Sequence, residues 1–122
     1  GDYLPQENLR VTLYRRLLKT DSLEEVRELR EETEDRFGRI PNELDFLFNV
    51  AAIKGASCDL GLTKMICSRY ELVLQGNPDG AWERLKLPPK WRRRLDGFIG
   101  PGGFAGIKDI ARIIQEQNPA SI

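Results

Sequence analysis

Apolar positions along the first half of the chain recur every three to four residues, which is the period of a helix packed on one side. Leu9, Leu13 and Leu17 lie four residues apart and predict a helix over residues 5–19. Tyr14 and Leu18 are expected to widen its apolar stripe. A third helix, over residues 41–60, is apolar on most sides, so we expect it to form the centre of the core. Its small residues Gly55 and Ala56 would let another element approach closely.

Between these two helices, a capping box predicts the start of a second one. Ser22 is followed three residues later by Glu25, so that each side chain can satisfy a backbone N–H near the other. The helix runs to Phe37, and Gly38 ends it with a left-handed residue. Its surface carries seven acidic and three basic side chains, and we expect pairs such as Glu32 with Arg36 along it.

From residue 62 the apolar period shortens to that of β-strands. The predicted elements are strands over 62–67, 70–75 and 91–99, and helices over 78–85 and 106–117. A flexible Gly-rich turn is expected over residues 100–103. The predicted fold class is α+β, with three N-terminal helices packed with a small, mainly antiparallel sheet and two further helices. The length fits one domain over residues 1–122.

Composition excludes several classes of protein. The chain has 19 basic and 19 acidic residues, two Cys and no His. Without His there is no Ser-His-Asp or Cys-His arrangement and no imidazole ligand for zinc. No apolar run approaches the roughly 20 residues of a membrane span, and no signal-peptide pattern opens the chain. We therefore predict a cytoplasmic protein without catalytic, cofactor-binding or metal-binding residues, in which Cys58 and Cys67 are buried, reduced thiols.

The segment from Gly100 to Ala105 matches the GxGxxG/A pattern of dinucleotide-binding sites. Such a site also needs a βαβ unit and an acidic residue about 20 positions later. Neither follows here, so the glycines favour a turn.

The net charge of zero is the sum of two unlike halves. Residues 1–54 hold 9 basic and 12 acidic side chains, and residues 55–122 hold 10 and 7. The acidic second helix is either a solvated face or a docking surface for a basic partner. A basic segment over residues 84–94 includes Lys90, Trp91, Arg92, Arg93 and Arg94. Such a segment either binds phosphates and stacks bases or is a strand edge whose charge discourages aggregation.

Four sequence blocks resemble the C-terminal domain of bacterial transcription-repair coupling factors. They are Tyr3-Leu4-Pro5-Gln6-Glu7-Asn8-Leu9-Arg10, Tyr14-Arg15-Arg16-Leu17, Asp35-Arg36-Phe37-Gly38-Arg39-Ile40-Pro41 and Leu60-Gly61-Leu62-Thr63-Lys64. A later match is Arg94-Leu95-Asp96-Gly97, and the chain departs from the family pattern after Gly97.

The resemblance implies a regulatory domain of a larger, ATP- and Mg-dependent DNA translocase that removes stalled RNA polymerase and recruits UvrA for nucleotide excision repair. In this family the domain packs on an N-terminal UvrB-like module, covers the UvrA-binding surface and restrains the motor. The positions that match the family's acidic contacts are Glu32 and Asp35. With Glu28, Glu31 and Arg36 they form the interdomain interface that we expect. The isolated domain is expected to be monomeric and to contact neither DNA nor a membrane directly. The alternative is a nucleic-acid-binding accessory module that uses the basic segment.

Overall fold

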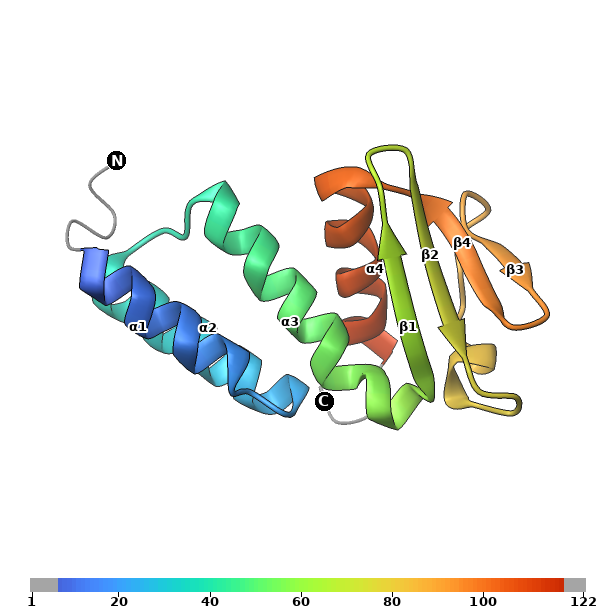
Figure 1. The fold of residues 1–122 in the computed structure, drawn as a ribbon, viewed down its shortest axis with the longest axis horizontal. Coiled ribbons are helices and arrows are strands. Elements are labelled where there is room, and N and C mark those ends of the chain that lie inside the picture. The colour runs from blue at the N-terminus through green and yellow to red at the C-terminus, as the bar shows by residue number, and fades with distance from the viewer. Residues whose placement is uncertain (1–6, 118–122) are drawn as a thin grey trace.

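The computed structural model describes residues 7–117, with side chains from residue 11 onward. The elements are α1 (Glu7–Leu18), α2 (Leu23–Phe37), α3 (Asn42–Leu60), β1 (Leu62–Cys67), β2 (Glu71–Gly76), the 3₁₀ helix η1 (Ala81–Arg84), β3 (Arg92–Arg94), β4 (Gly97–Pro101) and α4 (Gly103–Gln117). The four strands are antiparallel in the order β1-β2-β4-β3. Figure 1 shows α1 and α2 side by side at one end and the sheet at the other, with α3 between them. The predicted α+β fold is confirmed.

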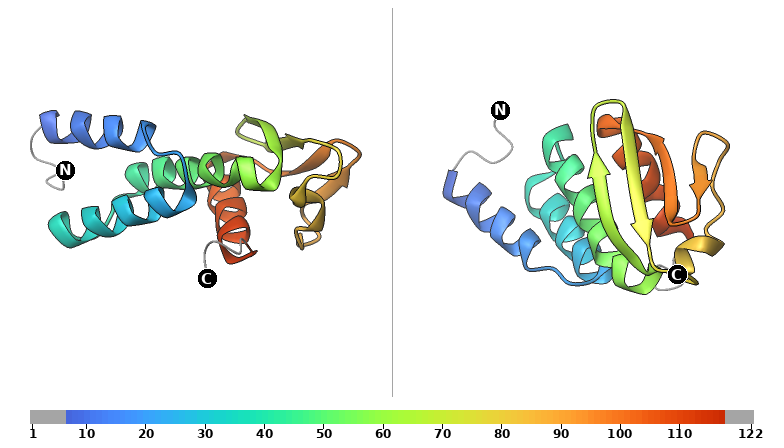
Figure 2. Two further views of the ribbon diagram at one scale, coloured as in Figure 1. Left: turned by 90° about the horizontal axis from the view of Figure 1, so that it is seen from below. Right: turned by 45° about the vertical axis from the view of Figure 1, so that its right-hand side comes forward.

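The central position of α3 explains why its sequence is apolar on most sides. Leu44 and Phe48 pack with α1 and α2 in one buried cluster, whereas Ile53 and Ala56 pack with the sheet, η1 and α4 in another. We call the first region, formed by α1, α2 and the first half of α3, the helical lobe. The second region, formed by the rest of α3, the sheet, η1 and α4, is the sheet lobe; Figure 2 shows the two from further sides.

The ends of α2 follow the predicted signals. The Ser22 hydroxyl accepts a hydrogen bond from the N–H of Glu25 at 3.2 Å. The Glu25 carboxylate accepts one from the N–H of Asp21 at 2.8 Å. Gly38 ends the helix with a φ of 90°, which favours glycine. The N-terminal end of α2 meets α3 closely, because a β-carbon at Gly55 would lie 2.7 Å from the Ser22 carbonyl carbon. The close approach predicted at Gly55 is therefore confirmed.

Several elements of the second half differ from the predictions. The helix expected over residues 78–85 is only the four-residue η1. The indole N–H of Trp82 in η1 donates to the carbonyl of Asn77 in the preceding turn at 2.8 Å. The single strand expected over residues 91–99 is two strands joined by a turn at Leu95 and Asp96, because β3 folds back onto β4. The last helix begins at Gly103, three residues before the predicted start.

The Gly-rich segment is a packed connection rather than a free turn. The N–H of Gly103 donates to the carbonyl of Ser68 at 2.8 Å, which ties the segment to the turn between β1 and β2. A side chain at Gly102 would overlap the backbone of that turn, and one at Gly100 would overlap the ring of Trp91. These glycines are needed because neighbouring groups fill the space of a side chain.

The predicted burial of four side chains is wrong, and two further predictions are not tested. Tyr14 and Leu18 are 37% and 74% exposed, because α1 lies on the outside of the helical lobe and packs through Leu13 and Leu17 alone among its described side chains. Cys58 and Cys67 are free thiols as predicted, but both are exposed, one in the last turn of α3 and the other at the end of the edge strand β1. The helix start at residue 5 and the side chain of residue 9 lie outside what the structure describes.

Candidate interaction surfaces

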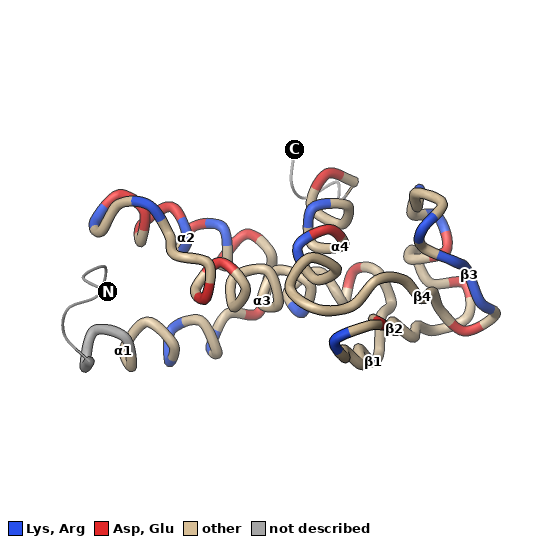
Figure 3. Tube along the Cα trace, turned by 90° about the horizontal axis from the view of Figure 1, so that it is seen from above, with Lys and Arg blue, Asp and Glu red and all other residues tan. Residues whose placement is uncertain are grey.

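The solvent side of α2 carries a row of acidic side chains. The helix buries Leu23, Val26, Leu29 and Thr33. On the opposite side, at spacings of four, three and four residues, lie Glu24, Glu28, Glu31 and Asp35, all exposed. None of these four forms an ion pair with a cation among the residues that the structure describes. We call this row the acidic ridge, and Figure 3 shows its acidic positions in red along α2.

Glu32 lies on the flank of α2 that faces α1, beside the ridge. Its carboxylate pairs with the Arg16 guanidinium at 2.5 Å, and both side chains are about half exposed. The pair lies in a groove of about 320 Å³ between α1 and α2, which is lined by Arg16, Thr20, Glu25, Glu28, Leu29 and Glu32. The expected pair of Glu32 with Arg36 is therefore replaced by one that joins two helices. The Arg36 guanidinium lies instead over the ring of Phe37, 5.3 Å from its centroid.

The other flank of α2 is fastened to α3. The Arg30 guanidinium donates to the Asp45 carboxylate at 2.9 Å and lies 4.9 Å from the ring centroid of Phe48. Of the five predicted interface residues, the structure places Glu28, Glu31 and Asp35 on one solvent-facing row. It does not place Glu32 or Arg36 there.

The basic segment does not form the base-stacking surface that the alternative function needs. Trp91 is 4% exposed, so its ring cannot receive a base in this fold. Lys90 pairs with Asp109 at 3.2 Å, and the Arg93 guanidinium donates to the carbonyl of Leu85. The sequence suggested an aromatic surface because it shows the spacing of Trp91 but not the direction in which the ring points.

Two of the three arginines in β3 remain on the outer face of the sheet. Arg92 is paired across the sheet with Ile99, and Arg94 with Gly97, so their side chains point to the same face as Ile99. Lys64 reaches this face from β1 through its pairing with Gln75. Sequence reasoning missed this grouping, because it depends on the register of four strands.

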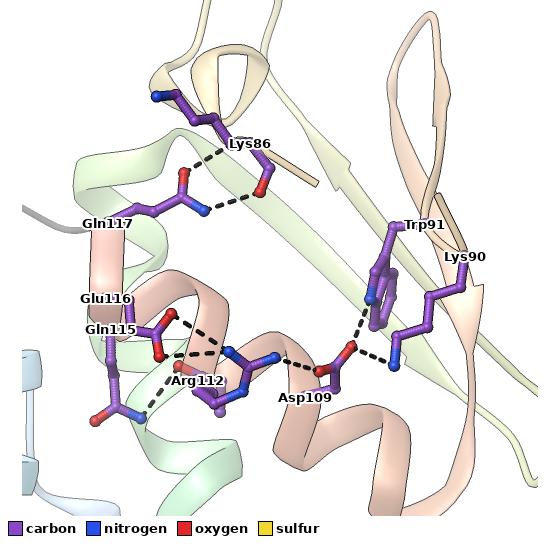
Figure 4. Close-up of polar contacts among 9 residues, drawn as sticks. Lys86, Lys90, Trp91, Asp109, Arg112, Gln115, Glu116 and Gln117 are labelled. Carbon is purple, nitrogen blue, oxygen red and sulfur yellow. Dashed lines mark hydrogen bonds and ion pairs between the residues drawn. The ribbon is translucent and has the colours of Figure 1, made fainter. Parts of the chain in front are cut away.

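Asp109 joins α4 to the segment before β3, as Figure 4 shows. Its carboxylate, 14% exposed, accepts hydrogen bonds from the Trp91 indole at 2.8 Å and from Arg112 at 2.8 Å, and pairs with Lys90. Burial raises the pKa of Asp109, but the bonds from Trp91, Arg112 and Lys90 together outweigh it, so the pKa lies below its ordinary value. Sequence reasoning missed this cluster. The three-residue spacing of Asp109 and Arg112 could have indicated their pair, but nothing in the sequence pattern indicates the bond to Trp91.

The described residues hold no cluster of three or more potential metal ligands. No helix among them combines the length and the apolar character needed to cross a membrane. The described surface carries an acidic ridge on the helical lobe, and on the sheet lobe Lys64, Arg92 and Arg94, which form no ion pair with another described residue.

A comparison with solved structures finds the same α+β fold in another protein domain. The crystal structure of the C-terminal domain of a transcription-repair coupling factor superposes with a TM-score of 0.59, covering 93% of this chain and 81% of the other. The sequence identity is 14%, so this likeness concerns the fold alone.

The sequence comparisons show the family. The profile of the TRCF domain matches residues 1–85. The transcription-repair-coupling factor of Helicobacter pylori is 30% identical over 89 residues, which is 73% of this chain and 9% of the relative. That of Escherichia coli is 28% identical over 94 residues, covering 74% of this chain and 7% of the relative, and that of Haemophilus influenzae is 27% identical over 116 residues, covering 90% and 10%. The chain belongs to the TRCF domain family and spans about a tenth or less of these relatives' length.

Proposed function

We propose that this chain is a non-catalytic regulatory domain of a transcription-repair coupling factor, in which the acidic face of α2 docks on an N-terminal UvrB-like module. The docked domain masks the UvrA-binding surface and restrains the translocase that removes stalled RNA polymerase. ATP and Mg act in the motor and not in this domain. Release of the domain exposes the UvrA-binding surface and starts transcription-coupled excision repair.

The observation that carries the proposal is the acidic ridge. Its carboxylates are exposed and without described cationic partners, so docking a basic surface breaks no existing ion pair at Glu31 or Asp35. Glu32, at the edge of the same face, exchanges Arg16 for a partner cation when the domain docks. Exposed ion pairs contribute about 0–1 kcal/mol each. Such contacts suffice because tethering in one polypeptide gives the two modules a high effective concentration.

Weak contacts also suit a reversible clamp, by which we mean the docked state that masks the UvrA-binding surface. An equilibrium held by a few exposed pairs shifts when another event changes the relative positions of the modules. The helical lobe can carry this surface without being distorted, because α2 is fixed to α3 by buried apolar residues on its opposite side.

The proposal is tested in the full-length translocase with Glu32→Ala and Asp35→Ala introduced together. Loss of two exposed contacts is expected to raise UvrA affinity about threefold to tenfold and to raise basal ATPase activity. The measurements are a UvrA binding titration and steady-state ATP hydrolysis without RNA polymerase. A matched control, Asp59→Ala with Glu83→Ala, removes two exposed acids from the sheet lobe and changes the net charge equally.

The control variant is expected to bind UvrA as the unmodified protein does. Unchanged UvrA affinity in the α2 variant contradicts the clamp. An equal increase in both variants shows that net charge, and not the face of α2, sets the affinity, and it also contradicts the proposal.

A further inference from the structure

The edge strand β1 has backbone hydrogen-bonding groups that no other described residue uses. The order β1-β2-β4-β3 gives β1 one neighbour, β2, as Figure 1 shows. Opposite residues of two antiparallel strands alternate between hydrogen-bonded and non-hydrogen-bonded pairs. The N–H of Ser68 donates to the carbonyl of Glu71 next to the turn, so these two residues form a bonded pair, and the pairs further along β1 and β2 alternate from there. Met65 and Cys67 then fall at the non-bonded positions of the β1–β2 ladder. Their N–H and C=O groups therefore point away from β2, toward the free edge.

A groove lies along this edge, between β1 and α3. It has a volume of about 330 Å³. Its lining residues are Val50, Ile53, Lys54, Ser57, Leu62, Thr63, Lys64, Met65 and Leu74. The α3 residues among them recur at three- and four-residue spacing, so they form one helix face turned toward the strand. The floor is mostly apolar, and the lining contains no acidic side chain.

From these features we infer that β1 and α3 together form a binding site for an extended peptide segment that carries apolar side chains at alternate positions and acidic ones between them. The segment adds to the sheet as a fifth strand beside β1, bonding to the backbone of Met65 and Cys67. Because side chains alternate across a strand, every second one enters the groove against Val50 and Ile53. The rest lie on the other face.

The charges at the rim select the acidic residues. Lys54 and Lys64 are exposed, and neither pairs with a carboxylate of the described residues. Lys64 points to the outer face of the sheet, where the intervening side chains of an added strand also lie. A second copy of the chain is a poorer occupant, because β1 contains no acidic side chain that could pair with these lysines. This inference does not depend on the acidic ridge, which lies on the other lobe.

The test uses the 122-residue chain and a seven-residue capped peptide in which Glu alternates with Val, Ile and Val. Amide hydrogen exchange is followed by NMR with the peptide at about ten times its Kd. Exchange at Met65 and Cys67 is expected to slow about tenfold. The internal control is the N–H of Arg93, which points outward from the opposite sheet edge and away from this groove. Its exchange is expected to stay the same.

Two peptide controls separate strand addition from simple apolar binding. A peptide with alternate backbone nitrogens methylated cannot donate to β1, and one with Lys in place of Glu meets like charges at the rim. Each is expected to bind at least about threefold more weakly. Equal binding of the methylated peptide overturns the inference, as does equal slowing at Arg93 or the absence of slowing at Met65.

Two protein variants complete the test. Met65→Pro removes an N–H that β2 does not use and is expected to weaken peptide binding at least about threefold while the sheet persists. Should that variant fail to fold, Lys54→Glu with Lys64→Glu changes only exposed side chains and is expected to weaken binding by a similar factor. Undiminished binding to the charge-reversed protein contradicts the inference. Concentration-dependent protection of Met65 without peptide also contradicts it, because a second copy of the chain then covers the edge.

Discussion

The helical and sheet lobes share α3 but differ in how they hold their charges. On the helical lobe the acidic ridge is exposed and unpaired among the described residues, and the pair of Glu32 with Arg16 is half exposed. On the sheet lobe Asp109 is nearly buried and binds three donors at once. Charges in water contribute little to stability and remain available to partners, whereas a buried, fully bonded carboxylate holds elements together. The first arrangement suits docking and the second suits folding.

The two lobes also differ in their packing. The sheet lobe buries two tryptophans, with Trp82 and Trp91 both near Phe98 at ring-centroid distances of 6.4 and 6.1 Å. The helical lobe relies on aliphatic side chains around Phe48, which is fully buried. Although α3 contributes to both, the two buried clusters are separate, so damage to one is expected to stay mainly within its own lobe.

The largest effect is expected from Phe48→Ala. Removing a fully buried aromatic ring leaves a cavity and costs about 3–5 kcal/mol. Chemical denaturation measures the loss, and hydrogen exchange shows where protection falls. If the lobes are separable, amides of α1 and α2 lose protection first while those of β2 and β4 keep it.

A control and a contrary outcome sharpen this comparison. Tyr70→Ala changes a side chain that is 82% exposed, so its effect is expected to stay within about 0.5 kcal/mol. Simultaneous loss of protection in α2 and β2 after Phe48→Ala would show that α3 couples the lobes into one cooperative unit.

A smaller effect, confined to the sheet lobe, is expected from Asp109→Asn. The amide keeps the size of the side chain but removes the negative charge to which Trp91, Lys90 and Arg112 bind. The free energy of unfolding is expected to fall by about 1–3 kcal/mol. The pKa of Asp109 is lowered in the folded state, so its contribution is present above the ordinary value of 3.8 and is lost as pH falls through the folded value. The unmodified protein therefore loses stability in this acidic range, and the variant loses less.

Denaturation at a series of pH values checks this prediction. Asp59→Asn is the control, because it neutralises an exposed acid in the same lobe. If the free energy of unfolding falls equally steeply at acidic pH in the unmodified protein and in Asp109→Asn, the assigned role of this carboxylate is contradicted.

The sequence predicted those features of the structure that depend on residues close together in the chain, and it missed those that depend on distant ones. The capping box at Ser22, the end of α2 at Gly38 and the close approach at Gly55 depend on neighbouring residues or on residue size, and all three were predictable. The burial of Trp91 and the split of one expected strand into β3 and β4 depend on partners distant in sequence. Strand register decides these features, and one sequence does not show register.

The candidate surfaces follow the same division. A helix has a fixed period, so the acidic ridge could be read from α2, including Glu28, Glu31 and Asp35. The pairing of Glu32 could not, because it depends on the position of Arg16 in another helix. The free edge of β1 and its groove needed the strand order and the packing of α3, neither of which the sequence pattern contains.

The smallest effect is expected at the pair of Glu32 with Arg16, and it bears most directly on docking. Both side chains are about half exposed, so a double-mutant cycle with Glu32→Ala and Arg16→Ala is expected to give a coupling of about 0.2–1 kcal/mol that shrinks in high salt. Denaturation of the four proteins at low and high salt measures it. A coupling in this range means that a partner cation can replace Arg16 at small cost, which keeps Glu32 available to the clamp. A coupling well above 1 kcal/mol, unchanged by salt, would mean that Glu32 is committed to joining α1 and α2, and the docking face would then be reduced to the ridge alone.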